Sequence, residues 1–220
     1  MRFDPGVLAG YLSPLLGGFV DTIWLCVLSA ILACVLGIAL VVGRRRGPRA
    51  LVVLIDVYMA LTLGMPLLVL LYVTFYVLPD FGLLLPAPVV GVVTLAIYYA
   101  PYVAQVIQAA IGAVPAGTIE AGVALGMPPL AIARRIVAPQ ALPLLLPALI
   151  GLFKDSALLS VISVHEFMFV AKGVVSETYA PLEVYFAVAL VYWAATAALA
   201  HATRHWERRI ARTHGLVPGR

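Results

Sequence analysis

Long apolar runs without charged residues divide this chain, and they restrict it to one class of fold. The first run, Thr22 to Val42, contains no charged side chain. A helix needs about 20 apolar residues to cross a bilayer core of roughly 30 Å. With 64% hydrophobic residues and a mean hydropathy of +1.08, the chain cannot cover itself with polar surface in water. The sequence therefore predicts an all-α integral membrane protein.

Further apolar segments follow the first run and give five predicted transmembrane spans in total. The spans cover approximately residues 22–42, 51–78, 87–114, 136–164 and 181–203. No internal repeat or low-complexity linker separates them. We therefore expect residues 1–220 to form a single transmembrane domain.

Arginines gather at alternate ends of these spans, and this placement predicts an orientation. The clusters are Arg44, Arg45, Arg46 and Arg49 after the first span, Arg134 and Arg135 before the fourth, and Arg204, Arg208, Arg209 and Arg212 after the fifth. Only Arg2 and Lys172 fall on the opposite side. The positive-inside rule then places the N-terminus outside and the C-terminus in the cytoplasm. The net charge of +4 follows from this topology, so it gives no reason to predict nucleic-acid binding.

The segment between the third and fourth spans, at about residues 115–138, carries an ordered pattern. It reads Glu120-Ala121-Gly122, three residues, Gly126, nine residues, Ile136, one residue, Ala138-Pro139. We expect Thr118 to cap a short helix with Glu120 in its first turn, and Gly126 to end that helix. A second short helix is expected to begin at Pro128-Pro129. Composition alone favours an amphipathic connector that lies on the membrane surface.

This pattern resembles the signature loop of the membrane subunits of bacterial ATP-driven importers. That loop reads Glu-Ala-Ala, three residues, Gly, nine residues, Ile, one residue, Leu-Pro, so Gly122 and Ala138 are small departures from it. The resemblance implies that the two short helices dock on a cytoplasmic ATPase subunit. The residues assigned to this coupling loop are Glu120, Ala121, Gly122, Gly126, Arg134, Arg135, Ile136 and Pro139.

Motifs elsewhere in the chain are similar to those of the polar amino acid permease branch of type I ATP-binding-cassette (ABC) importers. They include Gly64-Met65-Pro66-Leu67-Leu68, Pro139-Gln140-Ala141, Lys154-Asp155-Ser156-Ala157-Leu158, Glu177-Thr178-Tyr179-Ala180-Pro181 and Glu207-Arg208-Arg209. The resemblance implies a type I permease fold in the bacterial inner membrane and alternating-access transport of amino acids. It also implies a dimer with an identical or homologous permease, two ATPase subunits and an extracytoplasmic binding protein. ATP would be bound and hydrolysed by the partner, so we expect neither enzymatic activity nor a cofactor in this chain.

Two charged residues interrupt the fourth span and are candidates for the substrate pathway. Lys154 and Asp155 lie in an apolar stretch, where a charged side chain costs at least ~2.5–3.5 kcal/mol, so they are expected to face inward. Adjacent helical residues point about 100° apart, so each is expected to have its own partner on another helix or on the second subunit. A purely structural pairing between helices remains open. The neighbouring hydroxyl of Ser156 belongs to the same candidate group.

Further pathway candidates come from the second and third spans. Gly64 and Pro66 break the second span, and broken spans often line the pathway in transporters. Tyr102, Gln105 and Gln108 are the polar candidates on the third span. Leu63, Gln105 and Gln108 stand where the branch that the chain resembles commonly carries charge. This implies either a less charged substrate or a dimer member that makes few ligand contacts.

Other functions find less support in the sequence. His165-Glu166 lacks the second histidine of a zinc protease helix, since residue 169 is Phe, and no third ligand accompanies His201 and His205. No metal site is therefore predicted. No nucleophile, base and third group can be placed together, which argues against an intramembrane enzyme. A secondary transporter or channel driven by an ion gradient remains the alternative, and it is favoured if the loop merely lies on the membrane.

Overall fold

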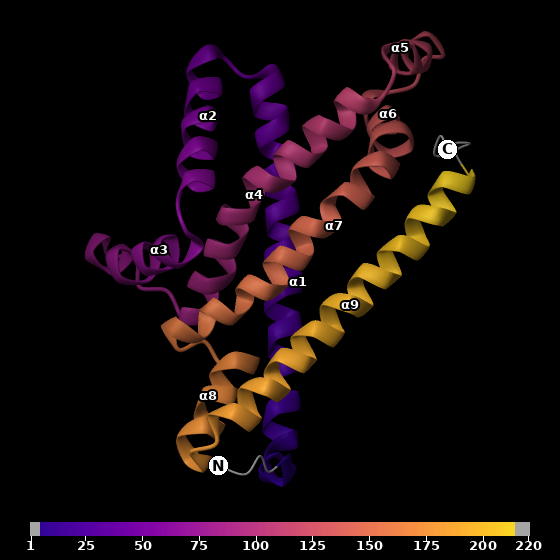
Figure 1. The fold of residues 1–220 in the computed structure, drawn as a ribbon. Helices are drawn as coiled ribbons and strands as arrows, with labels where there is room; N and C mark the ends of the chain where they lie inside the picture. The colour runs from indigo at the N-terminus through magenta and orange to yellow at the C-terminus, as the bar shows by residue number, and fades with distance from the viewer. Residues whose placement is uncertain (1–4, 214–220) are drawn as a thin grey trace.

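The computed structural model describes residues 5–213, and within α9 it describes side chains as far as His201. All elements of the described part are helical (Figure 1). Arg2 and the side chains of Arg204, His205, Arg208, Arg209 and Arg212 lie outside the described part. The predicted orientation of the termini, which depends partly on these arginines, therefore stays a prediction.

The first transmembrane segment is longer than the sequence predicts. A 3-10 turn at Pro5–Tyr11 leads into α1, which runs from Leu12 to Arg46. At 1.5 Å per residue, α1 is about 50 Å long and exceeds the thickness of a bilayer core. Gly47 caps its C-terminal end, where the Gly47 backbone N–H donates to Gly43 O at 2.8 Å. Pro48 then opens α2, so α1 and α2 meet in a tight turn.

The predicted second span is broken in two. α2 (Arg49–Gly64) and α3 (Leu67–Tyr72) meet at an angle of 110°, and π-helical and 3-10 turns prolong α3 to Phe81. Pro66 disfavours a helical conformation at the residue before it, and Met65 is accordingly extended (φ −114°, ψ 149°). The described part thus holds four helices that are long enough to cross a membrane, and a fifth span exists if the bent pair is one.

The third span, α4 (Ala87–Ala113), leads into the short α5 (Ala116–Ala124). From Pro129 the chain is helical without a break as far as Ile162. This stretch comprises α6 (Pro129–Ile132), a π-helical turn, α7 (Ala138–Asp155) and a 3-10 turn.

The expectation of a separate second loop helix was therefore wrong, because α6 continues directly into the fourth span. That span accordingly begins before residue 136 and ends before residue 164. Pro143 and Pro147 lie inside α7, and the helix accommodates both without ending.

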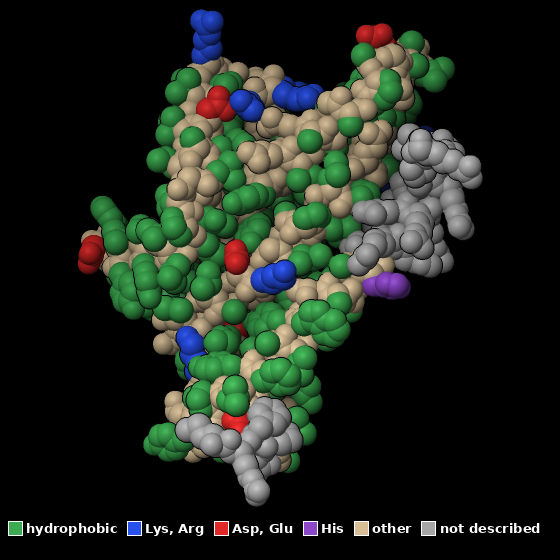
Figure 2. Space-filling model, viewed as in Figure 1, with side chains coloured by type: hydrophobic (Ala, Val, Ile, Leu, Met, Phe, Trp, Pro, Cys, Tyr) green, Lys and Arg blue, Asp and Glu red, His purple; other side chains and the backbone are tan. Residues whose placement is uncertain are grey.

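The last two helices complete the bundle. α8 (Phe167–Thr178) lies at the end opposite α5, and α9 (Pro181–Thr213) returns along α7 (Figure 1). The α1–α2 turn and α5 share one end of the bundle, which we call the α5 end. Figure 2 shows several basic side chains of the visible face at this end.

The core forms where α1 packs against α4. Ala33 is fully buried on α1, and Gly37 lies so close to α4 that an added Cβ would meet Val103 Cγ1 at 2.6 Å and Ala100 O at 3.0 Å. Small residues at helix interfaces allow such close approach in membrane proteins. Large apolar side chains such as Leu28 and Ile31 stay exposed on α1 and suit contact with lipid. Hydrophobic side chains cover much of the visible face of the bundle (Figure 2).

Candidate functional site

The loop between α4 and α6 is an ordered helical turn that projects from the α5 end. Pro115 sets the start of α5, with φ −55°, and Thr118 makes no side-chain cap. The expected Thr118 cap was therefore wrong, since the helix begins at Ala116. As a result Glu120 lies in the second turn of α5, where its side chain is exposed.

Gly126 ends α5 as the sequence predicts. Its φ of +73° is a left-handed conformation that glycine adopts at little cost. The backbone N–H groups of Gly126 and Met127 donate to Val123 O and Gly122 O at 2.9 and 3.0 Å. These bonds satisfy carbonyls at the end of α5 and turn the chain back toward α6.

Gly122 lies where α5 packs on the helix that follows. It is buried, and an added Cβ would lie 3.5 Å from Ile132 Cγ1 and 3.6 Å from Ile136 Cδ1, which are ordinary contacts. The alanine of the resembling pattern would therefore fit here.

The outer face of this turn is apolar with one acidic side chain. Val123, Leu125 and Leu130 are 61%, 81% and 79% exposed, and Glu120 is exposed beside them. Ala121, Arg134 and Arg135 are also exposed, whereas Ile136 and Pro139 are half-buried along the continuous helix. Isolated apolar residues on a surface are common, but a cluster on a projecting turn marks a surface that contacts a partner or lipid.

A cavity of about 390 Å³ lies between α4 and α7. Its lining consists of Tyr98, Tyr99, Tyr102, Gln105, Val106, Leu144, Pro147, Ala148, Gly151 and Asp155. The hydroxyl of Tyr99 donates to Asp155 Oδ2 at 2.7 Å. Gly151 leaves room for this contact, since a Cβ there would lie 3.0 Å from the Tyr99 hydroxyl oxygen.

Three tyrosine rings form one wall of this cavity. The centroids of Tyr98, Tyr99 and Tyr102 lie 5.5–5.7 Å from one another. Aromatic faces attract cations, and a carboxylate accepts hydrogen bonds from an ammonium group. The arrangement can therefore hold a positively charged amine.

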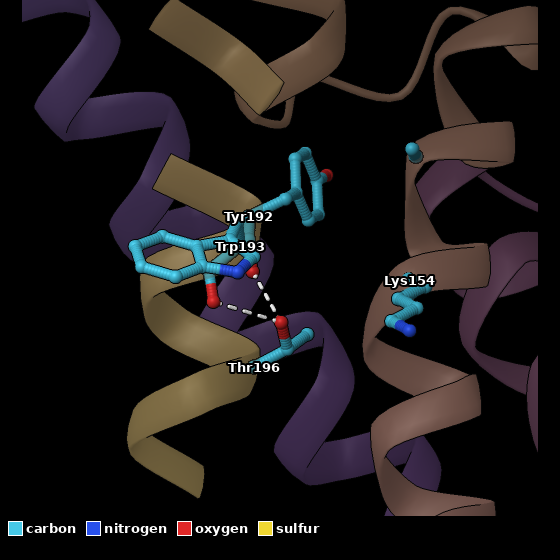
Figure 3. A pocket seen from close by; sticks show the side chains of 5 residues that line it. Lys154, Tyr192, Trp193 and Thr196 are labelled. Atoms are coloured by element: carbon cyan, nitrogen blue, oxygen red, sulfur yellow. Dashed lines mark hydrogen bonds between the residues drawn. The ribbon is translucent and has the colours of Figure 1, made fainter. Parts of the chain in front are cut away.

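A second cavity of about 360 Å³ lies between α7 and α9 (Figure 3). Lys154, Ala157, Tyr192, Trp193 and Thr196 line it. The hydroxyl of Thr196 already donates to Tyr192 O and Trp193 O of its own helix, at 2.8 and 3.0 Å. Lys154 is exposed and has no hydrogen-bond or ion-pair partner within the described part of the chain. Lys154 and Asp155 thus belong to different cavities.

The pathway candidates from the sequence fall into separate places. Tyr102, Gln105 and Asp155 come together in the α4–α7 cavity. Ser156 is buried and donates to Phe153 O, Gly64 and Pro66 form the α2–α3 bend, and Gln108 contacts Arg44. Tyr98 and Tyr99 were missed, although their spacing from Tyr102 on one apolar helix indicates a shared face.

In the described residues no three His, Cys, Asp or Glu side chains are placed to hold a metal ion.

Glu166 anchors α8 to α1 at the other end of the bundle. The side chain is fully buried, and it accepts hydrogen bonds from the backbone N–H groups of Met168 and Phe169 at 3.0 and 2.7 Å. Thr22 of α1 lies 3.3 Å from the same carboxylate and accepts the Phe167 N–H at 3.0 Å. Gly18 allows this contact, because a Cβ there would lie 2.8 Å from Val170 Cγ2.

Burial raises the pKa of Glu166 to about 7, against the hydrogen bonds and Lys172, which lower it. Glu166 lies outside the candidate spans, which end at Ile162 and resume at Pro181. Lys172 donates to Ser160 at 2.9 Å, so α8 is also tied to the turn that follows α7.

Comparison with known proteins identifies the family of the chain. Residues 33–212 match the family described as "Binding-protein-dependent transport system inner membrane component". The chain belongs to this family. It is therefore a membrane-spanning subunit of an inner-membrane transport system.

Relatives of the chain are named as permeases of ABC transporters or of amino acid transport systems. The chain is 30% identical to the probable glutamine ABC transporter permease GlnM of Bacillus subtilis, over 94% of this chain and 98% of the relative. It is 32% identical to the L-cystine transport system permease TcyB of the same organism, over 89% and 86%. A solved structure, described as an amino acid ABC transporter with histidines, has a TM-score of 0.83 and 31% identity, over 95% of this chain and 100% of that chain. These similarities establish the type I ABC permease fold that the sequence motifs imply.

Proposed function

We propose that this permease moves amino acids across the inner membrane by alternating access, driven by an ATPase that docks on the α5–α6 turn. The observation that carries the proposal is the exposed turn itself, since Glu120 and an apolar face project from the bundle. The left-handed Gly126 and the backbone hydrogen bonds that end α5 hold the turn in shape. Family membership favours this function over an ion-gradient transporter.

The proposed topology and assembly follow from the same function. The α5 end lies in the cytoplasm, consistent with its arginines, and the N-terminus lies outside. The chain pairs with an identical or homologous permease and receives substrate from an extracytoplasmic binding protein. ATP is bound and hydrolysed by the ATPase, and the permease itself needs no cofactor. Amino acids are the proposed substrates because relatives are named as glutamine and L-cystine permeases.

Glu120→Lys is expected to lower the recovery of the ATPase by at least about tenfold when the permease and the ATPase encoded beside it are co-purified. Reversing a charge at a docking surface removes favourable contacts and adds repulsion. Asp80→Lys, at an exposed acid on the far side of the α2–α3 bend, is the matched control and should leave recovery unchanged. Intact recovery and transport in Glu120→Lys would contradict docking through this turn.

We further propose that the α4–α7 cavity is part of the substrate pathway, with Asp155 and the tyrosine wall binding the substrate ammonium group. Asp155→Asn is expected to raise the KM for uptake about tenfold, since a charge-assisted hydrogen bond is lost. Lys154→Gln, in the second cavity, is the comparison. A larger rise in KM for Lys154→Gln than for Asp155→Asn would indicate that the substrate pathway runs through the α7–α9 cavity instead. Tyr99→Phe measures how much of the Asp155 effect comes from the Tyr99 contact alone.

A further inference from the structure

Arg44 joins three helices at the α5 end of the bundle. It lies on α1, and its Nε is 2.9 Å from Asp56 Oδ1 on α2. Its Nη1 donates to Gln108 Oε1 on α4, also at 2.9 Å. A guanidinium presents several donors in a fixed plane, so one side chain can hold two partners at once. Arg45 and Arg46 have no hydrogen-bond or ion-pair partner among the described residues.

Apolar contacts below Arg44 pack the same three helices together. Val41 of α1, Ile55 and Met59 of α2 and Ala104 of α4 form one buried cluster. The hydroxyl of Tyr58 on α2 donates to the Ile97 carbonyl oxygen on α4. The tight turn at Gly43–Gly47 shortens the connection between α1 and α2. Side-chain packing and hydrogen bonds therefore join the three helix ends into one unit.

Gln108 links this unit to the loop. It lies within the last two turns of α4, just before α5 begins at Ala116. Its Nε2 is buried without a hydrogen-bond partner among the described residues, whereas its Oε1 accepts from Arg44. A buried donor without an acceptor is unfavourable. The contact with Arg44 is thus the polar interaction that holds this side chain in place.

We propose that Arg44 is a positioning residue that ties the loop end of α4 to α1 and α2, so that displacement of α5 is carried to both helices. The inference rests on the proposed function, because the displacement comes from an ATPase docked on α5. Energetic coupling of this kind runs through packed side chains and hydrogen bonds that link rigid elements. Arg44 supplies such a link between three helices, in addition to any part it has in membrane topology.

The test compares Arg44→Gln with Arg45→Gln in the purified transporter reconstituted in lipid vesicles. ATPase recovery, ATP hydrolysis and the amount of substrate moved per ATP are measured together. Arg44→Gln is expected to keep ATPase recovery but to lower transport per ATP about fivefold, the lower range of typical coupling effects. Arg45→Gln, which changes the same charge without the contacts, should match the wild type.

Gln108→Leu provides a second variant that leaves the Arg44–Asp56 pair in place. It is expected to lower transport per ATP as Arg44→Gln does, and the double variant should be no worse than either single variant. Unchanged transport per ATP in both single variants, or an equal loss in Arg45→Gln, would overturn the role of Arg44. Failure of the wild-type chain to bind the ATPase would instead overturn the proposed function, and with it this inference.

Discussion

Glu166→Ala is expected to lower the melting temperature of the detergent-solubilised permease by about 10 °C. The substitution leaves the N–H groups of Met168 and Phe169 without their acceptor and removes the carboxylate beside Thr22. Losing a helix cap costs about 0.5–2 kcal/mol, and each buried unsatisfied group about 1–3 kcal/mol. Because the cap and the two N–H groups describe the same bonds, we take a loss of about 3 kcal/mol, which corresponds to a shift of about 6–12 °C in a chain of this size. The melting temperature is measured by heating samples to a series of temperatures and quantifying the remaining folded permease by size-exclusion chromatography.

Two variants separate the cap from loss of an acidic side chain in general. Glu166→Gln keeps one acceptor oxygen, so its melting temperature should fall less than that of Glu166→Ala. Asp80→Ala removes an exposed acid and should leave the melting temperature unchanged. Equal melting temperatures for Glu166→Ala and the wild type would show that α8 is held by its apolar contacts alone.

The same carboxyl group gives wild-type stability a dependence on pH. Because burial raises the pKa of Glu166 from 4.5 to about 7, the folded state binds the proton more tightly than the unfolded state. This stabilisation is complete below the unfolded pKa and is lost as pH rises through about 7. The melting temperature of the wild-type permease should therefore fall relative to that of Glu166→Gln as the pH rises from about 5 to about 8. Parallel pH profiles would contradict a buried titrating Glu166.

Gly37→Leu is expected to disrupt the packing of α1 on α4 and to reduce the yield of folded permease severely. Even a Cβ at this position would lie 2.6 Å from Val103 Cγ1 and 3.0 Å from the backbone oxygen of Ala100. Overpacking a tight interface commonly costs about 1–3 kcal/mol, and here the backbone of α4 itself obstructs the larger side chain. Fluorescence-detected size-exclusion of a tagged permease compares the amounts of folded protein.

Gly17 provides the control on the same helix. An added Cβ at Gly17 meets no atom within 4 Å in the described chain. Gly17→Leu should therefore preserve the monodisperse peak that Gly37→Leu loses. Similar losses in both variants would mean that glycine is needed along α1 for a reason other than contact with α4.

Much of this fold could be predicted from the distribution of charge and of helix-breaking residues. Uncharged runs identify the spans, Gly64-Met65-Pro66 marks the α2–α3 bend, and Gly126 ends α5. The continuity of α6 with α7 could not be predicted in the same way. Proline removes a hydrogen bond wherever it occurs, but in a packed bundle neighbouring groups can compensate, and sequence alone does not show whether they do.

The candidate site could likewise be predicted only in part. Charge in an apolar span indicates an important position, and Asp155 indeed lines a cavity with Tyr102 and Gln105. Sequence could not distinguish the cavity of Lys154 from that of Asp155, because this depends on which helices flank α7. As a polar residue in an apolar span, Gln108 is a pathway candidate by sequence. In the structure its side chain instead accepts a hydrogen bond from Arg44.

The uninterrupted helix from Pro129 to Ile162 has a mechanical consequence. Asp155 lies about 40 Å along this helical stretch from its first residue, at 1.5 Å per residue. If this stretch pivots near its loop end, a tilt of only about 5° moves Asp155 by about 3 Å, because Asp155 lies about 40 Å from the pivot. That arc is comparable to the 2.7 Å between Asp155 and the Tyr99 hydroxyl. A small change of angle at the loop end of this helix is thus large enough to make or break a single contact near its other end.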